Sequence, residues 1–164
     1  MKRAISTQQT QANIATIMDL LAETPKRLER LSATLSSEQL RRSLGAGERS
    51  PTETLAHLVN CEERSAQAIY LALLLDAPYL PDIHPERQWG KLLRHDLCDF
   101  ADLLAYFRFR RRVLLPVLTA LTQDQWARVV REEGKQRQES VYWQARGLAL
   151  HELAHLTDLE AKLA

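Results

Sequence analysis

The chain has 164 residues, of which 45% are hydrophobic and 26% are charged, as in an ordinary globular domain with a full core. Its net charge of +1, from 22 basic and 21 acidic side chains, excludes a long-range field that would attract nucleic acid or anionic lipid. The longest apolar run, residues 68–75, is far shorter than the roughly 20 residues of a membrane span. The polar start argues against secretion, and Cys61 and Cys98 make no disulfide framework. We therefore expect one domain over residues 1–164, in the cytoplasm and away from membranes.

The first predicted helix covers residues 8–33. Apolar side chains recur there three or four positions apart, which is the spacing of one buried helical stripe. Pro25 lies inside this stretch and has no backbone N–H to donate. We therefore expect a kink or a break near Glu23 and Thr24.

The second predicted helix covers residues 51–75 and has a marked beginning. Ser50 and Glu53 have the spacing of a capping box, and Pro51 stands at the first helical position, where its missing N–H costs nothing. Residues 76–90 contain three prolines and cannot continue the helix. This stretch is predicted to be an ordered crossing loop.

Two further long helices are predicted. Helical periodicity returns over residues 95–121, with a kink expected at Pro116, and a short helical turn is expected over residues 124–127. Ser140 is a plausible cap for a last helix that runs to the end of the chain. Because no window alternates apolar and polar residues over a strand length, the sequence predicts an all-α four-helix bundle.

The last helix carries the segment HELAH. Its two histidines, His151 and His155, lie four positions apart, so both imidazoles occupy one helix face and could clamp a divalent metal ion. The segment matches the zinc-protease pattern, in which the intervening glutamate is the base. However, Asp158 and Ala161 occupy the positions of the further glycine and histidine, and no later helix could supply a glutamate ligand. A zinc peptidase is therefore disfavoured.

A third ligand must then come from upstream, and His57 on the second helix is the best candidate. Leu58 and Val59 flank it, and Cys61 follows one turn later, so His57 lies at or beside the buried stripe. An imidazole without a partner would be costly in that position. The spacing therefore favours a metal site built from the second and last helices.

The order of these motifs resembles the DinB/YfiT-like superfamily over nearly the whole chain: a capped helix with HLVNCE, an apolar helix with FRFRRR and a last helix with HELAH. The resemblance implies a four-helix bundle with long crossing connections, often a homodimer, and one metal ion held by His57, His151 and His155. Zinc or nickel suits these ligands best, with iron or manganese as alternatives. The family commonly has aspartate at the position of Asn60 and often an arginine near Ala68, so the subfamily and substrate stay open.

Three neutral imidazoles would leave such an ion its full charge and at least one open coordination position. That arrangement suits activation of water or of a thiol. The resemblance implies the same two classes, metal-dependent hydrolases and thiol-dependent S-transferases or isomerases. We therefore expect a small-molecule substrate, with a low-molecular-weight thiol as a candidate partner.

Several residues could assist the metal site. Three acidic residues are candidates for orienting the imidazoles: Glu53, Glu152 and Asp158. Glu152 fits a solvated position equally well. Cys61 is a candidate fourth ligand, a redox-sensitive thiol or a small buried residue, the last being the commonest case. His84 and His95 lie in or beside the crossing loop and are expected at the surface.

The run Arg108, Arg110, Arg111 and Arg112 introduces a second class of function, a patch for nucleic acid or an acidic partner. No aromatic platform or glycine-rich loop supports base stacking, so nucleic-acid binding is disfavoured. A solvated helix face, with one arginine reaching the cleft, is the preferred interpretation. A metal-free or regulatory interaction bundle is a third alternative.

Overall fold

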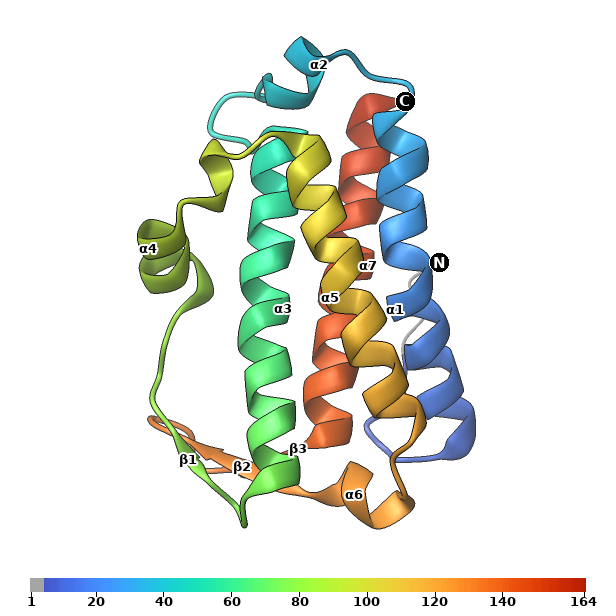
Figure 1. Ribbon diagram of the computed structural model, residues 1–164, viewed down its shortest axis with the longest axis vertical. Coiled ribbons are helices and arrows are strands. Elements are labelled where there is room, and N and C mark those ends of the chain that lie inside the picture. Colours follow the sequence, from blue (N-terminus) through green and yellow to red (C-terminus); the bar gives the residue numbers. More distant parts are fainter. Residues whose placement is uncertain (1–4) are drawn as a thin grey trace.

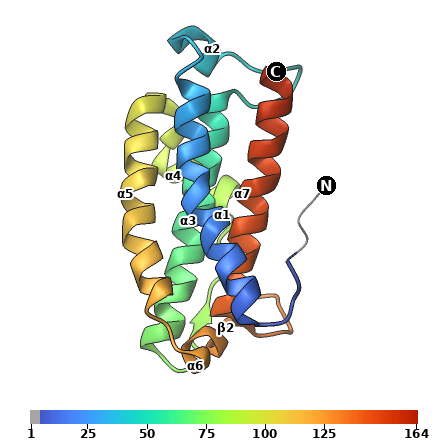
Figure 2. The same cartoon turned by 90° about the vertical axis from the view of Figure 1, so that its right-hand side faces the viewer.

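Four long helices form a bundle in the computed structural model, which describes residues 5–164 (Figure 1). They are α1 (Gln11–Ser32), α3 (Pro51–Leu74), α5 (Phe100–Thr119) and α7 (Val141–Leu163). Both α1 and α3 pack against α5 and α7 (Figure 2). The predicted all-α bundle is confirmed. Among the described residues, no helix is long and apolar enough to cross a membrane.

A long connection makes α3 and α5 run in the same direction, because residues 75–99 return along the length of the bundle (Figure 1). An ordered crossing loop is expected over residues 76–90, but residues 75–99 contain short regular elements. They are β1 (Tyr79–Leu80), a π-helical turn (Pro85–Gly90), α4 (Lys91–Leu93) and a 3-10 turn (His95–Leu97). The π-helical turn packs against α3. The connection therefore forms an extra wall beside that helix.

The beginning of α3 follows the predicted capping box. The Ser50 hydroxyl accepts a hydrogen bond from the Glu53 N–H, and the Glu53 carboxylate accepts one from the Ser50 N–H at 2.7 Å. One other helix boundary differs from expectation, and one short helix was not predicted. The helix expected from residue 95 begins at Phe100, because Arg94 has a positive φ of 51° and the next residues form the 3-10 turn. The short α2 (Ser37–Arg41) was not predicted.

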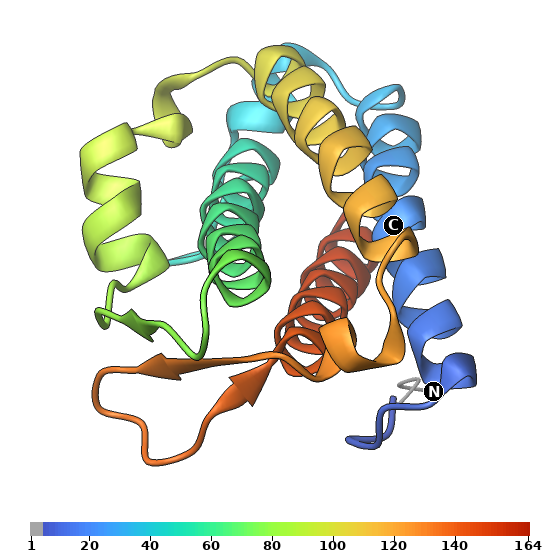
Figure 3. The ribbon, with the colours of Figure 1, turned by 60° about the horizontal axis from the view of Figure 1, so that its bottom comes forward.

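The connection between α5 and α7 contains α6 (Gln123–Ala127), close to the predicted helical turn, and two strands that were not predicted. Strand β2 (Val129–Glu132) pairs in parallel with β1 and antiparallel with β3 (Glu139–Ser140), closing one end of the bundle (Figure 3). Such short strands leave no detectable alternation in the sequence. The Ser140 hydroxyl accepts from the Trp143 N–H and caps α7, as predicted.

A buried polar layer divides the core into two apolar clusters. One cluster includes Ile17 and Leu114, and the other includes Leu58, Phe107 and Leu156. Between them lies the Arg111 network, which we define as Arg111, Glu62, Glu152 and the Leu21 carbonyl. All three side chains are almost completely buried. The network joins α1, α3, α5 and α7 at one level of the bundle.

The Arg111 network explains why α1 continues without a break through Pro25. A proline removes the N–H that would bond the carbonyl four residues earlier, here that of Leu21. The Arg111 guanidinium donates to that carbonyl at 2.5 Å. Of the kink or break expected near Glu23 and Thr24, the break does not occur, because a side chain from another helix replaces the missing donor. Likewise, α5 continues through Pro116 to Thr119.

Candidate metal centre

Three histidines predicted to lie together do so between α3 and α7. His57 comes from the first half of α3, and His151 and His155 lie one turn apart on α7. The Nε2 atom of His57 is 2.9 Å from Nε2 of His151 and 3.1 Å from Nε2 of His155. Three ring nitrogens thus converge on one point. We call these three side chains the histidine cluster.

The surroundings favour neutral imidazoles in this cluster. Burial lowers the pKa of His57 and of His151, although nearby carboxylates oppose the shift. Burial and the two neighbouring imidazoles lower the pKa of His155 to about 4. Neutral imidazole is the form that coordinates a metal ion, because the charged form has no free lone pair.

Glu86 fixes which nitrogen of His57 faces the cluster. Its carboxylate accepts a hydrogen bond from Nδ1 of His57, so the lone pair lies on Nε2, toward the other two rings. Arg49 lies 3.3 Å from the second carboxylate oxygen. Although burial opposes it, the contact with His57 and the Arg49 guanidinium lower the pKa of Glu86, which is therefore ionised at neutral pH.

Glu86 was missed by sequence reasoning. It sits in the π-helical turn of the connection, where the His84 ring accepts hydrogen bonds from the Glu86 and Arg87 N–H groups and Pro85 occupies the first position. A histidine cap followed by proline and glutamate is a helix-start pattern, and that signal could have marked an ordered turn. Its contact with His57 could not have been deduced.

Two acidic candidates have other partners. Glu53, expected to orient His57, instead caps α3 through the Ser50 N–H, and Glu86 occupies the position beside the imidazole. Asp158 is exposed and accepts a hydrogen bond from Lys162 at 2.8 Å. Neither carboxylate has a hydrogen bond with the histidine cluster among the described residues.

Glu152 is neither solvated nor directed at the histidines. It is completely buried, and its two oxygens accept hydrogen bonds from Arg111 at 2.6 and 3.1 Å. The second carboxylate of the network, Glu62, lies 3.5 Å from the same guanidinium, and burial raises its pKa to about 7. Glu152 thus anchors α7 through a different helix face from the one that carries His151.

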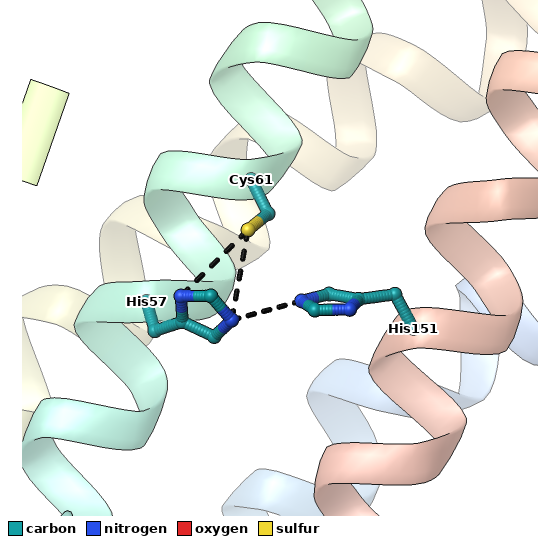
Figure 4. A group of neighbouring side chains, drawn as sticks. All are labelled: His57, Cys61 and His151. Atoms are coloured by element: carbon teal, nitrogen blue, oxygen red, sulfur yellow. Dashed lines mark hydrogen bonds between the residues drawn. The ribbon is translucent and has the colours of Figure 1, made fainter. Parts of the chain in front are cut away.

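Cys61 borders the cluster one turn after His57 on α3. Its sulfur lies 3.7 Å from Nε2 and 3.8 Å from Nδ1 of His57. Donor atoms of His57, Cys61 and His151 all lie within 4.8 Å of one another (Figure 4). Burial raises the pKa of the Cys61 thiol to about 12. When no metal ion is bound, Cys61 is therefore a neutral thiol.

The other two histidines are half-buried and have structural contacts. His84 caps the π-helical turn, and Nδ1 of His95 lies 2.9 Å from the side-chain oxygen of Asn60. The Asn60 amide also limits the approach of the connection, because a Cβ at Gly90 would come within 3.1 Å of its nitrogen. Asn60 thus helps to fix the wall that carries Glu86.

Several cavities border this region, and two of them are lined by His57 or by Cys61. One of about 400 Å³ is lined by Arg49, His57, Asn60, Glu86 and Lys91, among others. A smaller cavity of about 240 Å³, the Cys61 cleft, is lined by Cys61, Arg64, Ser65, Pro85, Gly147, Leu148 and His151. Both linings are mixed in charge and polarity. Their dimensions fit a small molecule better than a polymer.

The arginine run does not form a continuous basic patch. Arg111 is buried in the network, which corrects the expectation that it shares a solvated face. Arg108 pairs with Glu29 at 2.6 Å, and Arg110 lies over the Tyr106 ring. Ion pairs and ring contacts thus occupy these side chains, which weakens the interpretation as a nucleic-acid surface.

The residues present fit a divalent metal ion. Ligand nitrogens about 2.1 Å from a tetrahedral ion lie about 3.4 Å apart, slightly more than the observed separations of 2.9 and 3.1 Å, so a small outward movement of the rings would admit an ion. The Nε2 atom of His57 has a lone pair and no proton, because Nδ1 donates to Glu86, and a neutral imidazole can offer the same kind of nitrogen at His151 and His155. A cation would satisfy all three at once.

Fold and side chains together define a four-helix bundle with a histidine cluster between its second and last long helices. The model of the DinB superfamily matches residues 20–159, and the chain belongs to that superfamily.

The chain is also similar to a solved structure, YfiT from Bacillus subtilis, described as a probable metal-dependent hydrolase with an unusual four-helix bundle topology. The two are 19% identical, with a TM-score of 0.81 over 99% of this chain and 94% of YfiT. At this identity the likeness establishes the fold. A comparison with curated proteins gave no match.

Proposed function

We propose that this protein binds one divalent transition-metal ion through His57, His151 and His155 and uses it on a small-molecule substrate. The proposal is carried by the position of Nε2 of His57, which lies within hydrogen-bond distance of Nε2 of both His151 and His155. Zinc or nickel fits the imidazole donors best, with iron or manganese as alternatives. The description of YfiT as a probable metal-dependent hydrolase supports the same assignment.

The reaction class is hydrolysis or thiol-dependent S-transfer. When bound, the ion would supply a Lewis acid that activates water or a thiol as the nucleophile. Glu86 would hold His57 in the tautomer that offers Nε2, and Arg49 would hold Glu86. The Cys61 cleft would receive the small molecule, and a low-molecular-weight thiol is the candidate second substrate.

We also propose that the protein forms a homodimer. Tyr106, Phe109 and Val113 are exposed and lie three to four residues apart, so they form one apolar row on α5. Light scattering on the purified protein tests this proposal. A monomer mass at all concentrations would contradict it.

Metal analysis tests the main proposal. Untagged protein should contain, or take up, about one equivalent of zinc or nickel, and His155→Ala should lose that binding while staying folded. His95→Gln serves as a control, because it removes a histidine outside the cluster. Protein that takes up no transition metal would exclude the proposal. Loaded protein should then be assayed with ester and amide substrates and with thiols plus electrophiles.

A metal-free interaction bundle is the competing function. It predicts that neither removal of metal nor His155→Ala changes any measured activity or complex.

A further inference from the structure

A thiol, that of Cys61, lies beside the histidine cluster. Cys61 and His57 are four residues apart on α3, so their side chains share one helix face. His57 and His151 belong both to the histidine cluster and to the group that contains Cys61 (Figure 4). The Cys61 sulfur therefore approaches ring nitrogens of two of the three histidines that would hold a metal ion.

The separation between sulfur and nitrogen is the one that coordination requires. A tetrahedral ion with sulfur at about 2.3 Å and nitrogen at about 2.1 Å places those two ligands about 3.6 Å apart. The Cys61 sulfur lies 3.7 Å from Nε2 of His57. The Nδ1 atom of the same ring is already bonded to Glu86, so it is no free partner for the thiol.

Cys61 is not simply a small residue of the hydrophobic core. It belongs to neither apolar cluster, and it lines the Cys61 cleft with polar neighbours such as Arg64 and Ser65. A buried structural cysteine is normally surrounded by apolar side chains. Its environment thus points to a ligand rather than to packing.

The site also lacks an anionic donor. The three imidazoles are neutral, Glu86 is engaged by His57 and Arg49, and Glu152 is engaged by Arg111. A divalent ion held by imidazoles alone would keep both positive charges in a half-buried site. A thiolate would neutralise one of them.

We propose that Cys61 is a fourth, thiolate ligand of the metal ion, completing a set of three histidines and one cysteine. The proposal rests on the proposed function, because it assumes that the histidine cluster binds the ion. On binding, the S–H bond breaks, a sulfur–metal bond forms and one proton goes to solvent.

Two consequences follow from a thiolate ligand. Thiolate favours zinc, cobalt or nickel over manganese, so the choice of metal becomes narrower. Four protein ligands also fill a tetrahedral shell, so a small molecule must enter as a fifth ligand or displace Cys61. Its route would be the cleft that Cys61 and His151 both line.

Cobalt(II) absorption of the full-length protein tests the proposal. The wild type should take up one equivalent and show visible ligand-field bands together with a strong near-ultraviolet band from thiolate-to-cobalt charge transfer. Cys61→Ser should lose the near-ultraviolet band, keep visible bands and bind zinc at least about 10-fold more weakly, since it loses a direct ligand. Cys98→Ser is the matched control, because Cys98 is exposed and should leave the spectrum unchanged.

The outcomes are distinguishable. Uptake of cobalt by the wild type without a charge-transfer band would overturn the Cys61 assignment and leave the three-histidine site intact. Failure of the wild type to bind cobalt or zinc would overturn both proposals. If Cys61→Ser does not fold, X-ray absorption at the zinc edge of the wild type decides, because a thiolate ligand requires sulfur scattering at about 2.3 Å. A shell of nitrogen and oxygen alone would contradict the proposal.

Discussion

The same two helices carry two polar clusters of opposite character. His151 and Glu152 are neighbours on α7, yet one faces His57 at the edge of a cleft and the other is sealed inside the bundle against Arg111. In the Arg111 network, a guanidinium joins groups from three other helices. In the histidine cluster, Nε2 atoms of His151 and His155 face the unprotonated Nε2 of His57.

This difference indicates how a small bundle can support a reactive site. A buried ion pair contributes little net stability, but removal of one partner is costly because it leaves a buried charge uncompensated. The Arg111 network therefore fixes α3 and α7 relative to each other by penalising any movement that separates its charges. The histidine cluster needs such fixed helices because its ligands come from both of them.

The largest expected effect tests the network directly. Arg111→Met should lower the free energy of unfolding by about 3–5 kcal/mol, because Glu152 and the Leu21 carbonyl would stay buried after losing their hydrogen-bond donor. Urea denaturation of metal-free protein measures the loss. Arg108→Met, three residues earlier, removes only the exposed pair with Glu29 and should cost less than about 1 kcal/mol. Equal losses in the two variants would remove the contrast between the network and the surface.

Glu62 should make the network sensitive to pH. Because burial raises its folded-state pKa from 4.5 to about 7, its contribution to stability is complete below pH 4.5 and is lost as the pH rises through 7. Glu62→Gln keeps the shape of the side chain without its charge. The free energy of unfolding of this variant should therefore exceed that of the wild type by about 1–3 kcal/mol at pH 8 and by much less at pH 5. Denaturation at both pH values measures this difference. The exposed Glu29→Gln should show no such trend.

Glu86 tests the histidine cluster. Glu86→Gln should weaken zinc binding about 10- to 100-fold, because His57 loses the carboxylate that fixes its tautomer and orientation. Competition with a chromophoric chelator measures the affinity. Glu53→Gln is the matched control, since glutamine can still complete the capping box and Glu53 has no bond to the cluster. Equal weakening in both variants would show that Glu86 has no specific role.

The smallest expected effect concerns Pro25. Pro25→Ala restores an N–H that can donate to the Leu21 carbonyl, so Arg111→Met should cost about 1 kcal/mol less in that background. A double-mutant cycle in urea measures the coupling. Strict additivity would mean that Arg111 does not replace the donor that the proline lacks.

Local geometry explains which features could be predicted. The capping box at Ser50 and Glu53 and the four-residue spacing of His151 and His155 depend only on neighbours within one turn, so both were visible in the sequence. His57 was identified because a histidine on a buried face needs a partner. The convergence of the three rings followed, while their role as metal ligands stays a prediction.

Partners from distant segments could not be predicted in the same way. Glu86 meets His57 because residues 75–99 fold back along α3, and no local pattern specifies the orientation of that connection. Glu53 is closer to His57 in sequence than Glu86 is, but its carboxylate accepts a hydrogen bond from the Ser50 N–H at the beginning of α3. The short strands β2 and β3 likewise depend on pairing across segments rather than on periodicity.

The sequence by itself determined the four long helices and the residues that could bind a metal ion, because helix periodicity and capping act over a few residues. Tertiary structure alone decided which partner each polar group received. Arg111 was expected among solvated arginines, but it donates the hydrogen bond that keeps α1 continuous at Pro25. Glu152 was a candidate for a position beside the metal, but it is the counterion of Arg111. Burial enforces such pairings, because a polar group removed from water must find a partner wherever the fold provides one.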